Sequence, residues 1–296
     1  MTPTPATPSF AASAGAITLG GDMTVRRLGY GAMRLTGKGI WGPPADRPAA
    51  LATLRRAVEL GVNFIDTADS YGPYASEELI AEALTPYPSD LVVATKGGWQ
   101  RPGPGQWLHN ASPKHLEAAV EGSLKRLRLE RIDLYQLHVP DPAVSFDASI
   151  GVLARMRDAG KIRHIGLSNV TKEHVERARK IVPIASVQNR YSFSDREWDY
   201  LVDHCEAVGI AFLPWGPLAQ HRKANQAIET IAAARGVSAV VVSLAWLLRR
   251  SPIMLPIPGT SSIQHLEEDL SAASFNLTDA EFATLGAVVP EPFSLR

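Results

Sequence analysis

The stretch Asn63-Phe-Ile-Asp-Thr-Ala-Asp-Ser-Tyr-Gly72 begins with a short apolar run and turns polar at Asp66. Short apolar runs without strict alternation are typical of parallel strands covered on both faces. A helix is predicted just before it, because Leu51 and Leu54 share one helical face and Gly61 provides a C-terminal stop. The stretch therefore marks one strand of an α/β protein, with polar side chains where the strand ends.

The same strand-then-helix unit recurs along the chain. Short, mostly apolar runs are predicted as eight strands, at residues 27–31, 63–66, 91–96, 132–138, 163–168, 186–188, 211–215 and 253–257. Helical stretches lie between them, with Ser112 and Thr171 at expected N-cap positions. Eight strands alternating with helices predict a parallel sheet closed into a (β/α)8 TIM barrel, a single-domain α/β fold.

The N-terminal segment is predicted to lie outside this repeat. Residues 1–15 are rich in Pro, Thr and Ala and lack the basic-then-apolar pattern of a signal peptide, which predicts a disordered leader. Residues 17–25 alternate apolar and polar side chains around Gly20 and Gly21, which predicts a β-hairpin that caps the bottom of the barrel. The barrel domain is expected to span residues 16–296.

Composition and charge limit the partners. The 296 residues include 30 basic and 30 acidic side chains, so no net charge attracts the whole molecule to nucleic acid or anionic lipid. No apolar stretch approaches the ~20 residues that span a bilayer. Cys205 is the single cysteine and cannot form an intrachain disulfide. We predict a cytoplasmic protein, monomeric or weakly homo-oligomeric, without nucleic-acid or membrane partners.

Four polar side chains are predicted to meet where three successive strands end. Function in such barrels is built at the carboxyl ends of the strands. Asp66, Lys96 and His138 each close an apolar strand, and Tyr71 follows Asp66 in the next loop. Any one of them alone is more often a structural ion pair or a packing residue. Four suitable types at neighbouring strand ends favour a catalytic site.

These residue types suit the reduction of a carbonyl. The developing alkoxide needs a proton, and a free phenol with a pKa of ~10 donates it poorly near neutrality. Lys96 is expected to lower the pKa of Tyr71, and Asp66 to hold Lys96 charged and in place. His138 is expected to hydrogen-bond the substrate oxygen and fix its orientation. Tyr71 is therefore the predicted general acid.

From about Leu28 to its C-terminus, the chain resembles the aldo-keto reductase family. The likeness is carried by residues 63–72, by Ala94-Thr-Lys96 and by Leu137-His138. The resemblance implies hydride transfer from nicotinamide C4 of NADPH to an aldehyde or ketone. It also implies a catalytic tetrad of Asp66, Tyr71, Lys96 and His138.

The resemblance further implies which residues bind the cofactor. Ser168 and Asn169 follow the fifth strand and, with Gln188, would hold the nicotinamide carboxamide. Tyr191 would stack on the nicotinamide ring. The full set assigned to the cofactor is Gly31, Ala32, Met33, Asp66, Ser168, Asn169, Gln188, Tyr191, Trp215, Gly216, Pro217, Leu218, Arg222, Gly259, Thr260, Ser261, His265, Glu268 and Asp269.

Two loops are candidate phosphate sites. Trp215-Gly-Pro-Leu218 follows the seventh strand, and residues 257–262 follow the eighth and open a short helix whose N–H groups suit an anion. Many relatives carry Lys or Arg there for the 2′-phosphate of NADP, whereas this chain has Gly259 and Ser261. Arg222 is expected to compensate, so NADPH is the predicted cofactor and NADH the alternative.

Two further patterns in the sequence do not predict a binding site. Gly29-Tyr-Gly-Ala-Met-Arg34 looks like a truncated dinucleotide fingerprint, but it lacks the third glycine and no helix pattern follows. The remaining histidines show no paired metal-ligand spacing, so no metal site is predicted.

The substrate is predicted from aromatic loops. Trp41, Trp99 and Trp107 are expected to form a flat or hydrophobic wall, with Tyr71 and His138 as the polar contacts. Residues 29–35 and 41–47 resemble a bacterial subgroup that includes pyridoxal reductases. Pyridoxal, or another aromatic or hydrophobic carbonyl such as a keto-steroid, a xenobiotic ketone or a sugar, is therefore the expected substrate.

Two alternatives to a reductase come from other classes of function. Some relatives are NADP-binding regulatory subunits of potassium channels, and the resemblance alone does not separate them from enzymes. A barrel glycosidase would need two carboxylates about 5 Å apart. The predicted fourth and seventh strands end in His138 and Trp215, which disfavours a glycosidase.

Overall fold

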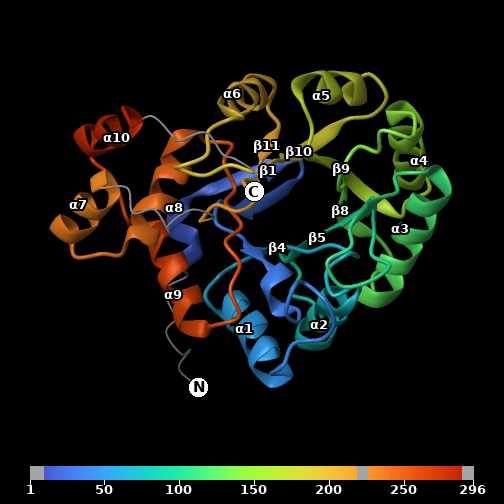
Figure 1. The fold of residues 1–296 in the computed structure, drawn as a ribbon, viewed down its shortest axis with the longest axis horizontal. Coiled ribbons are helices and arrows are strands. Elements are labelled where there is room, and N and C mark those ends of the chain that lie inside the picture. Colours follow the sequence, from blue (N-terminus) through green and yellow to red (C-terminus); the bar gives the residue numbers. More distant parts are fainter. Residues whose placement is uncertain (1–9, 219–225, 289–296) are drawn as a thin grey trace.

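The structure is a computed structural model that describes residues 10–218 and 226–288, and its helices surround a central set of parallel strands (Figure 1). Neighbouring strands follow the order of the chain: β3 (Tyr30–Gly31), β4 (Phe64–Asp66), β5 (Val92–Gly97), β8 (Ile132–Leu137), β9 (Ile162–Ser168), β10 (Ile184–Gln188) and β11 (Ala211–Phe212). The helices are α1 (Arg47–Glu59), α2 (Ala75–Leu84), α3 (Pro113–Leu127), α4 (Phe146–Asp158), α5 (Lys172–Arg179), α6 (Asp199–Val208), α7 (Gln226–Arg235), α8 (Ala239–Arg250), α9 (Ile263–Ser271) and α10 (Asp279–Gly286). Shorter elements are η2 (Ala32–Leu35) and η3 (Ala272–Ser274).

The eighth predicted strand closes the barrel as an irregular segment. Phe212 N donates to the Ile253 carbonyl, and Leu255 N donates back to the Phe212 carbonyl, both at 2.9 Å. This exchange is the parallel pairing expected between β11 and a following strand. The barrel predicted from eight apolar runs is therefore confirmed, although its last strand is held by few bonds.

The reason for the irregularity lies at the seam with β3. The carbonyls of Pro256 and Pro258 accept from Gly29 N and Gly31 N at 2.9 and 3.0 Å. Proline has no N–H, so this edge can accept but cannot donate, and half of the ladder is lost. A Cβ on Gly31 would lie 2.7 Å from the Ile257 carbonyl oxygen. The glycines that looked like a nucleotide fingerprint thus allow the seam to close.

Alternate residues of each strand point into the barrel. Phe64 and Leu134 belong to the interior cluster, whereas Ile65 and Tyr135 pack outward against helices. Because strand side chains alternate with a period of two, continuing toward the carboxyl ends identifies the remaining inward positions. These positions carry polar side chains: Asp66, Lys96, Gln136, His138, Ser168 and Gln188.

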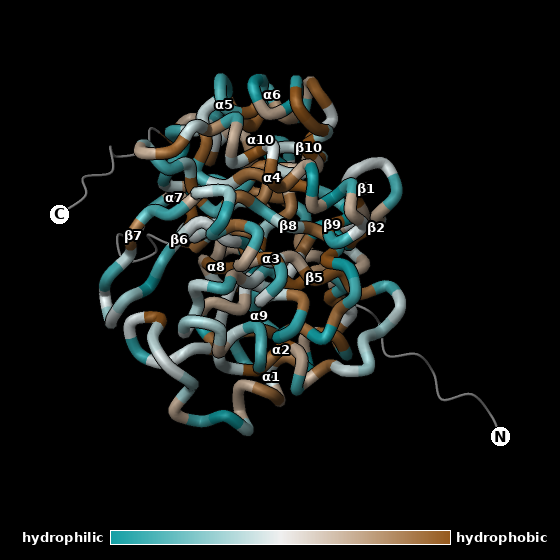
Figure 2. The backbone as a smooth tube through the Cα atoms, turned by 90° about the vertical axis from the view of Figure 1, so that its right-hand side faces the viewer, coloured by the Kyte–Doolittle hydropathy of each residue, from teal (hydrophilic) through white to brown (hydrophobic). Residues whose placement is uncertain are grey.

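The opposite end of the barrel is sealed by the predicted hairpin. β1 (Ala16–Leu19) and β2 (Met23–Arg26) pair antiparallel, and Leu19 and Val25 are buried in the interior cluster. Asp22, in the hairpin turn, forms an ion pair with Arg163 and a hydrogen bond with His164 at the start of β9. Figure 2 shows β1 and β2 on one side of the barrel strands, and β6 (Trp99–Gln100) and β7 (Leu108–His109) on the other.

Part of the predicted leader is structured. Residues 1–9 lie outside the described residues, but η1 (Phe10–Ala14) is a 3-10 helix. Ala11 is fully buried, and its N–H donates to the Leu60 carbonyl at 3.4 Å. The prediction of disorder through residue 15 is wrong for these residues. Small side chains give no periodic signal, yet they allow a close fit against the end of α1.

In the described part of the chain, no helix has both the length and the apolar character needed to cross a membrane. Only α7 and α8 taken together meet that requirement, and they meet at an angle of 104°. Residues 241–247 of α8 are buried within the fold.

Candidate active site

Lys96 is the centre of the buried polar group at the carboxyl ends of β4 and β5. Its Nζ donates to Asp66 Oδ1 at 2.6 Å, to the Thr67 carbonyl at 2.8 Å and to the Tyr71 hydroxyl at 3.3 Å. Burial alone would lower the pKa of Lys96, but Asp66 and Tyr71 outweigh it and raise that pKa. The three acceptors keep the Lys96 ammonium charged and fix its orientation.

The pKa of Tyr71 departs from the prediction. Burial raises it above its ordinary value, while Lys96 lowers it and Asp66 raises it further. The expected influence of Lys96 is present, but the expectation of a net decrease is wrong. A charged phenolate is costly in a buried site, and the sequence does not reveal how deeply the ring is buried.

Asp66 is fixed by two amides as well as by Lys96. Gln136 Nε2 and Gln188 Nε2 each donate to Asp66 Oδ2 at 2.9 Å. Gln136 was not predicted as a site residue, although a glutamine at an inward position, two residues before His138, was a usable signal. Gln188, predicted to bind the nicotinamide amide, contacts Asp66 through its nitrogen.

His138 lies beside Tyr71 in the position that the strand ends predict. The two rings are 5.8 Å apart and nearly perpendicular, and His138 Nδ1 is 3.4 Å from Ser70 Oγ. Burial, with a smaller effect of Lys96, lowers the pKa of His138 well below its ordinary value. The imidazole is therefore neutral, which suits orienting a carbonyl oxygen by hydrogen bonding better than donating a full proton.

Asn169 connects this group to the next strand ends. Its Nδ2 donates to the His138 carbonyl at 2.9 Å, and its Oδ1 accepts from Trp215 Nε1 at 3.1 Å. Trp215 is half-buried just after β11, and Ser168 is buried beside Asn169. Residues predicted to hold the nicotinamide thus stand next to the residues predicted to perform the chemistry.

Tyr191 does not reach the mouth of the barrel, which is the opening at the carboxyl ends of the strands where Lys96 and His138 lie. Its ring is fully buried, lies 6.1 Å from Trp246 in a stacked arrangement, and meets Phe212 edge-on. Its hydroxyl donates to Asp199. The prediction that Tyr191 stacks on nicotinamide is wrong, because both its ring and its hydroxyl are committed to the layer between the barrel and the helices. Trp215 is the aromatic residue that reaches the mouth.

Comparison with known proteins agrees with this arrangement. A model of the Aldo/keto reductase family matches residues 27–290. This chain belongs to the aldo-keto reductase family. Its members act on small-molecule carbonyl compounds with nicotinamide cofactors, so the chain is an NAD(P)H-dependent oxidoreductase.

Individual relatives cover almost the whole aldo-keto reductase chain. An uncharacterised oxidoreductase of Schizosaccharomyces pombe is 46% identical over 93% of this chain and 90% of its own. Pyridoxine 4-dehydrogenase of Escherichia coli is 44% identical over 92% of this chain and 97% of its own. An aldo-keto reductase of Klebsiella pneumoniae, solved with NADPH, has a TM-score of 0.79 at 25% identity and covers 94% of this chain and 95% of its own.

The aldo-keto reductase chain also brings its predicted phosphate residues to the mouth. Gly259 and Ser261 are exposed just before α9, whose N-cap Ser262 accepts from His265 N at 3.4 Å. A Cβ on Gly259 would lie 2.5 Å from the Gly31 carbonyl oxygen, so this loop and the end of β3 are in contact. N–H groups at a helix N-terminus and nearby hydroxyls are donors of the kind that bind a diphosphate.

Other residues assigned to the cofactor have mixed placements. Met33 is half-buried and Ala32 buried in η2, directly after β3. Glu268 is half-buried on α9, whereas Asp269 is buried, and burial together with Glu268 raises the pKa of Asp269 to about 7. After Trp215, Gly216 and Leu218 are half-buried and Pro217 is buried. Arg222 lies outside the described residues.

The three predicted substrate tryptophans lie in the segments that follow β3 and β5, and Trp99 lies beside His138. β6 (Trp99–Gln100) pairs with β7 (Leu108–His109). The Trp99 ring lies 6.3 Å from His138 and 5.8 Å from Trp107, edge-on in both cases. Trp41 forms an isolated parallel β-bridge with Gly72, and Gly72 directly follows Tyr71 in the chain. An aromatic wall therefore stands beside the predicted acid.

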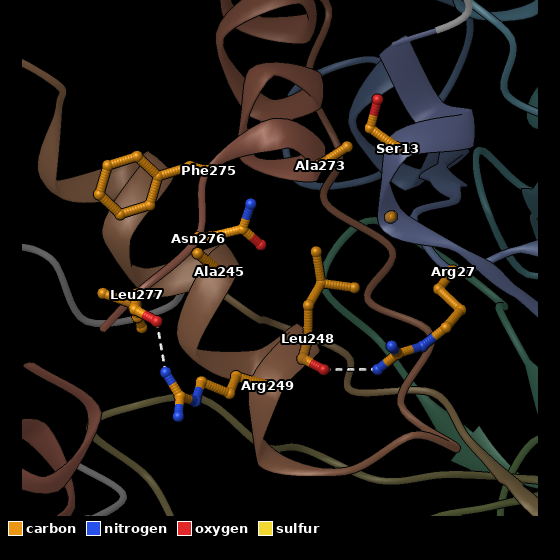
Figure 3. Close-up of a pocket in the computed structure, with 10 residues that line it drawn as sticks. Ser13, Arg27, Ala245, Leu248, Arg249, Ala273, Phe275, Asn276 and Leu277 are labelled. Atoms are coloured by element: carbon orange, nitrogen blue, oxygen red, sulfur yellow. Dashed lines mark hydrogen bonds between the residues drawn. The ribbon is translucent and has the colours of Figure 1, made fainter. Parts of the chain in front are cut away.

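A cavity of about 320 Å³ lies elsewhere in this aldo-keto reductase (Figure 3). Arg27 and Arg249 flank it, but their side chains donate to the carbonyls of Leu248 and Leu277. Its lining includes Ala245 and Leu248 of α8 and Arg27, which precedes β3, and none of the four residues of the predicted tetrad. Among the described residues, no group of three or more His, Cys, Asp or Glu side chains could hold a metal ion.

Proposed function

We propose that this aldo-keto reductase reduces an aldehyde or ketone with NADPH, and that Tyr71 is the general acid. The observation that carries the proposal is the 3.3 Å contact between Lys96 Nζ and the Tyr71 hydroxyl, inside a group from which water is largely excluded. The bound nicotinamide supplies the hydride. We further propose that the enzyme is cytoplasmic and monomeric or weakly self-associating.

Burial raises the pKa of Tyr71 and makes the phenol a weaker acid, so the proposed proton transfer depends on Lys96, which lowers that pKa. Burial keeps the phenol protonated before the reaction, so the proton is present when a carbonyl arrives. As negative charge develops on the substrate oxygen, Tyr71 gives up its proton and the Lys96 ammonium stabilises the resulting phenolate. Asp66 keeps Lys96 charged, and neutral His138 hydrogen-bonds the oxygen and aligns the carbonyl.

The cofactor would occupy the mouth between β9, β11 and α9. Ser168, Asn169 and Gln188 would hold the carboxamide, and Trp215 would provide the aromatic platform. Asn169 Oδ1 accepts from the Trp215 indole, which fixes the plane of that platform. The loop before α9 would bind phosphate. NADPH is the proposed cofactor, in line with the solved relative, and NADH is the alternative.

The proposed substrate is a flat aromatic aldehyde, with pyridoxal as the first candidate. Trp41, Trp99 and Trp107 offer the ring faces and edges that such a molecule packs against. The 44% identical Escherichia coli relative is a pyridoxine 4-dehydrogenase, whose name refers to the same ring system.

The test is turnover by the purified protein. Loss of NADPH or NADH absorbance is followed across a panel of aldehydes and ketones that includes pyridoxal. We expect many turnovers per enzyme molecule, with aromatic aldehydes preferred and NADPH favoured. Tight NADP binding without turnover on any carbonyl would overturn the enzymatic proposal and favour a regulatory subunit. Preference for aliphatic sugars would overturn the aromatic substrate alone.

A further inference from the structure

Arg101 connects three loops around the mouth. It follows β6 and is 9% exposed. Its Nε donates to the Gln106 carbonyl at 2.9 Å, and its Nη1 donates to the carbonyls of Ser70 at 2.8 Å and Ile40 at 3.2 Å. One guanidinium therefore ties the loop after β3, the loop after β4 and the β6–β7 loop together.

The same guanidinium contacts the predicted substrate wall. Its Cζ lies 3.6 Å from the centre of the Trp107 ring and 5.4 Å from that of Trp41. A planar cation at these distances is attracted to aromatic faces and restricts how the rings turn. Arg101 thus contacts two of the three predicted substrate tryptophans, Trp41 and Trp107.

The contacts of Arg101 indicate a geometric role. Within residues 10–218 and 226–288, the hydrogen bonds of Arg101 go to backbone carbonyls, and its Nη2 is buried without a partner. A buried charge with an unused donor is costly, so a neutral residue would connect these loops at lower cost in stability. What the guanidinium adds is a rigid fork that reaches three loops at once.

We propose that Arg101 is a positioning residue. It fixes the orientation of the acid Tyr71 relative to the predicted substrate tryptophans, Trp41 and Trp107. Ser70 and Tyr71 share a peptide group, so holding the Ser70 carbonyl limits the direction in which the Tyr71 side chain leaves the backbone. Ser70 Oγ also lies 3.4 Å from His138 Nδ1. The inference rests on the proposed role of Tyr71 as the acid.

Arg196 provides a matched control in the same chain. Its Nε, Nη1 and Nη2 donate to the carbonyls of Phe193, Gly286 and Leu285 at 3.0, 3.1 and 2.9 Å. Its Cζ lies 4.5 Å from the centre of the Trp246 ring. Arg196 therefore has the same chemistry as Arg101, but it ties the segment after β10 to the end of α10 and contacts none of the four tetrad residues in the described part of the chain.

The experiment compares Arg101→Lys with Arg196→Lys. The pKa of Tyr71 is measured by NMR on protein carrying ring-labelled tyrosine, with Tyr71→Phe used to assign the signal. Melting temperature, kcat and KM for an aromatic aldehyde are measured in parallel. We expect Arg101→Lys to shift the pKa of Tyr71, to lower kcat by about 10- to 100-fold and to raise KM. Arg196→Lys should lower the melting temperature and leave the other three quantities unchanged.

The outcomes separate this inference from the proposed function. A wild-type protein that reduces no carbonyl would overturn the proposed function, and the NMR titration would still decide whether Arg101 positions Tyr71. An unchanged pKa of Tyr71 and unchanged kcat in Arg101→Lys would overturn the positioning role. If Arg101→Lys does not fold, Arg101→Gln, which keeps amide donors without charge, is judged by the same two results.

Discussion

The inward-facing positions of the strands carry polar side chains at one end of the barrel and apolar side chains at the other. At the carboxyl ends these positions hold a lysine, an aspartate and two glutamines, all buried and joined by hydrogen bonds. At the amino ends they are apolar and are covered by Leu19 and Val25 of the hairpin. Buried charge costs free energy, whereas apolar burial supplies it. The comparison indicates that one end stabilises the fold and the other uses part of that stability for chemistry.

The largest expected effect is at the polar end. Tyr71→Phe removes the proposed acid and one acceptor of Lys96 while keeping the ring that meets His138. We expect kcat to fall by about 10²- to 10⁴-fold. NADPH affinity, measured by fluorescence titration, should stay near that of the wild type. Turnover equal to the wild type on a good substrate would refute the role of Tyr71.

The apolar end should show the reverse pattern. Leu19→Ala opens a cavity beneath the barrel and should reduce the free energy of unfolding by about 2–5 kcal/mol. Because Leu19 is remote from the mouth, kcat below the melting temperature should not change. Denaturant titration measures the loss, and Thr18→Ala, at an exposed position of the same strand, is the control. A proportionate fall in kcat would show that the two ends are not separate.

A smaller effect is expected in the loop before α9. Ser261→Arg places a guanidinium at an exposed position where the 2′-phosphate is proposed to bind. Affinity for NADPH should rise by about 10-fold, the size of one added charged hydrogen bond, while affinity for NADH stays constant. Comparable tightening of both cofactors would locate the 2′-phosphate elsewhere.

The smallest effect concerns the cost of buried carboxyl groups at the polar end. Burial, and next the nearby Glu77, raises the pKa of Asp69 well above its ordinary value. The folded protein therefore holds a proton that the unfolded chain releases, and Asp69 lowers stability increasingly as pH rises above the unfolded pKa of ~3.9.

Asp69→Asn should remove this cost. We expect its melting temperature to exceed that of the wild type by about 2–4 °C at about pH 8, the shift that ~1 kcal/mol produces in a domain of this size. The gain should shrink toward about pH 4, where both states of the wild type hold the proton. Calorimetry at several pH values measures it, with exposed Asp90→Asn as the control. A gain independent of pH would argue against a protonated Asp69.

Local patterns in the sequence were enough to predict the eight strands, the hairpin and the meeting of Asp66, Lys96, Tyr71 and His138. Each apolar run in the sequence marks a strand and the residue at which it ends. Parallel strands then bring their carboxyl ends to one side of the sheet. The irregularity of the eighth strand could also have been predicted, because Pro256 and Pro258 have no backbone N–H to donate to a neighbouring strand.

Other properties depend on contacts between segments that are distant in the chain. Tyr191 and Trp215 both follow barrel strands, and their burial alone shows that Trp215 reaches the mouth while Tyr191 packs in the core. The direction of the pKa shift of Tyr71 depends on how much water the fold removes, and the three loops held by Arg101 come together only when the barrel closes. Solvent exclusion and the approach of separate loops are properties of the assembled chain, and no residue type encodes them by itself.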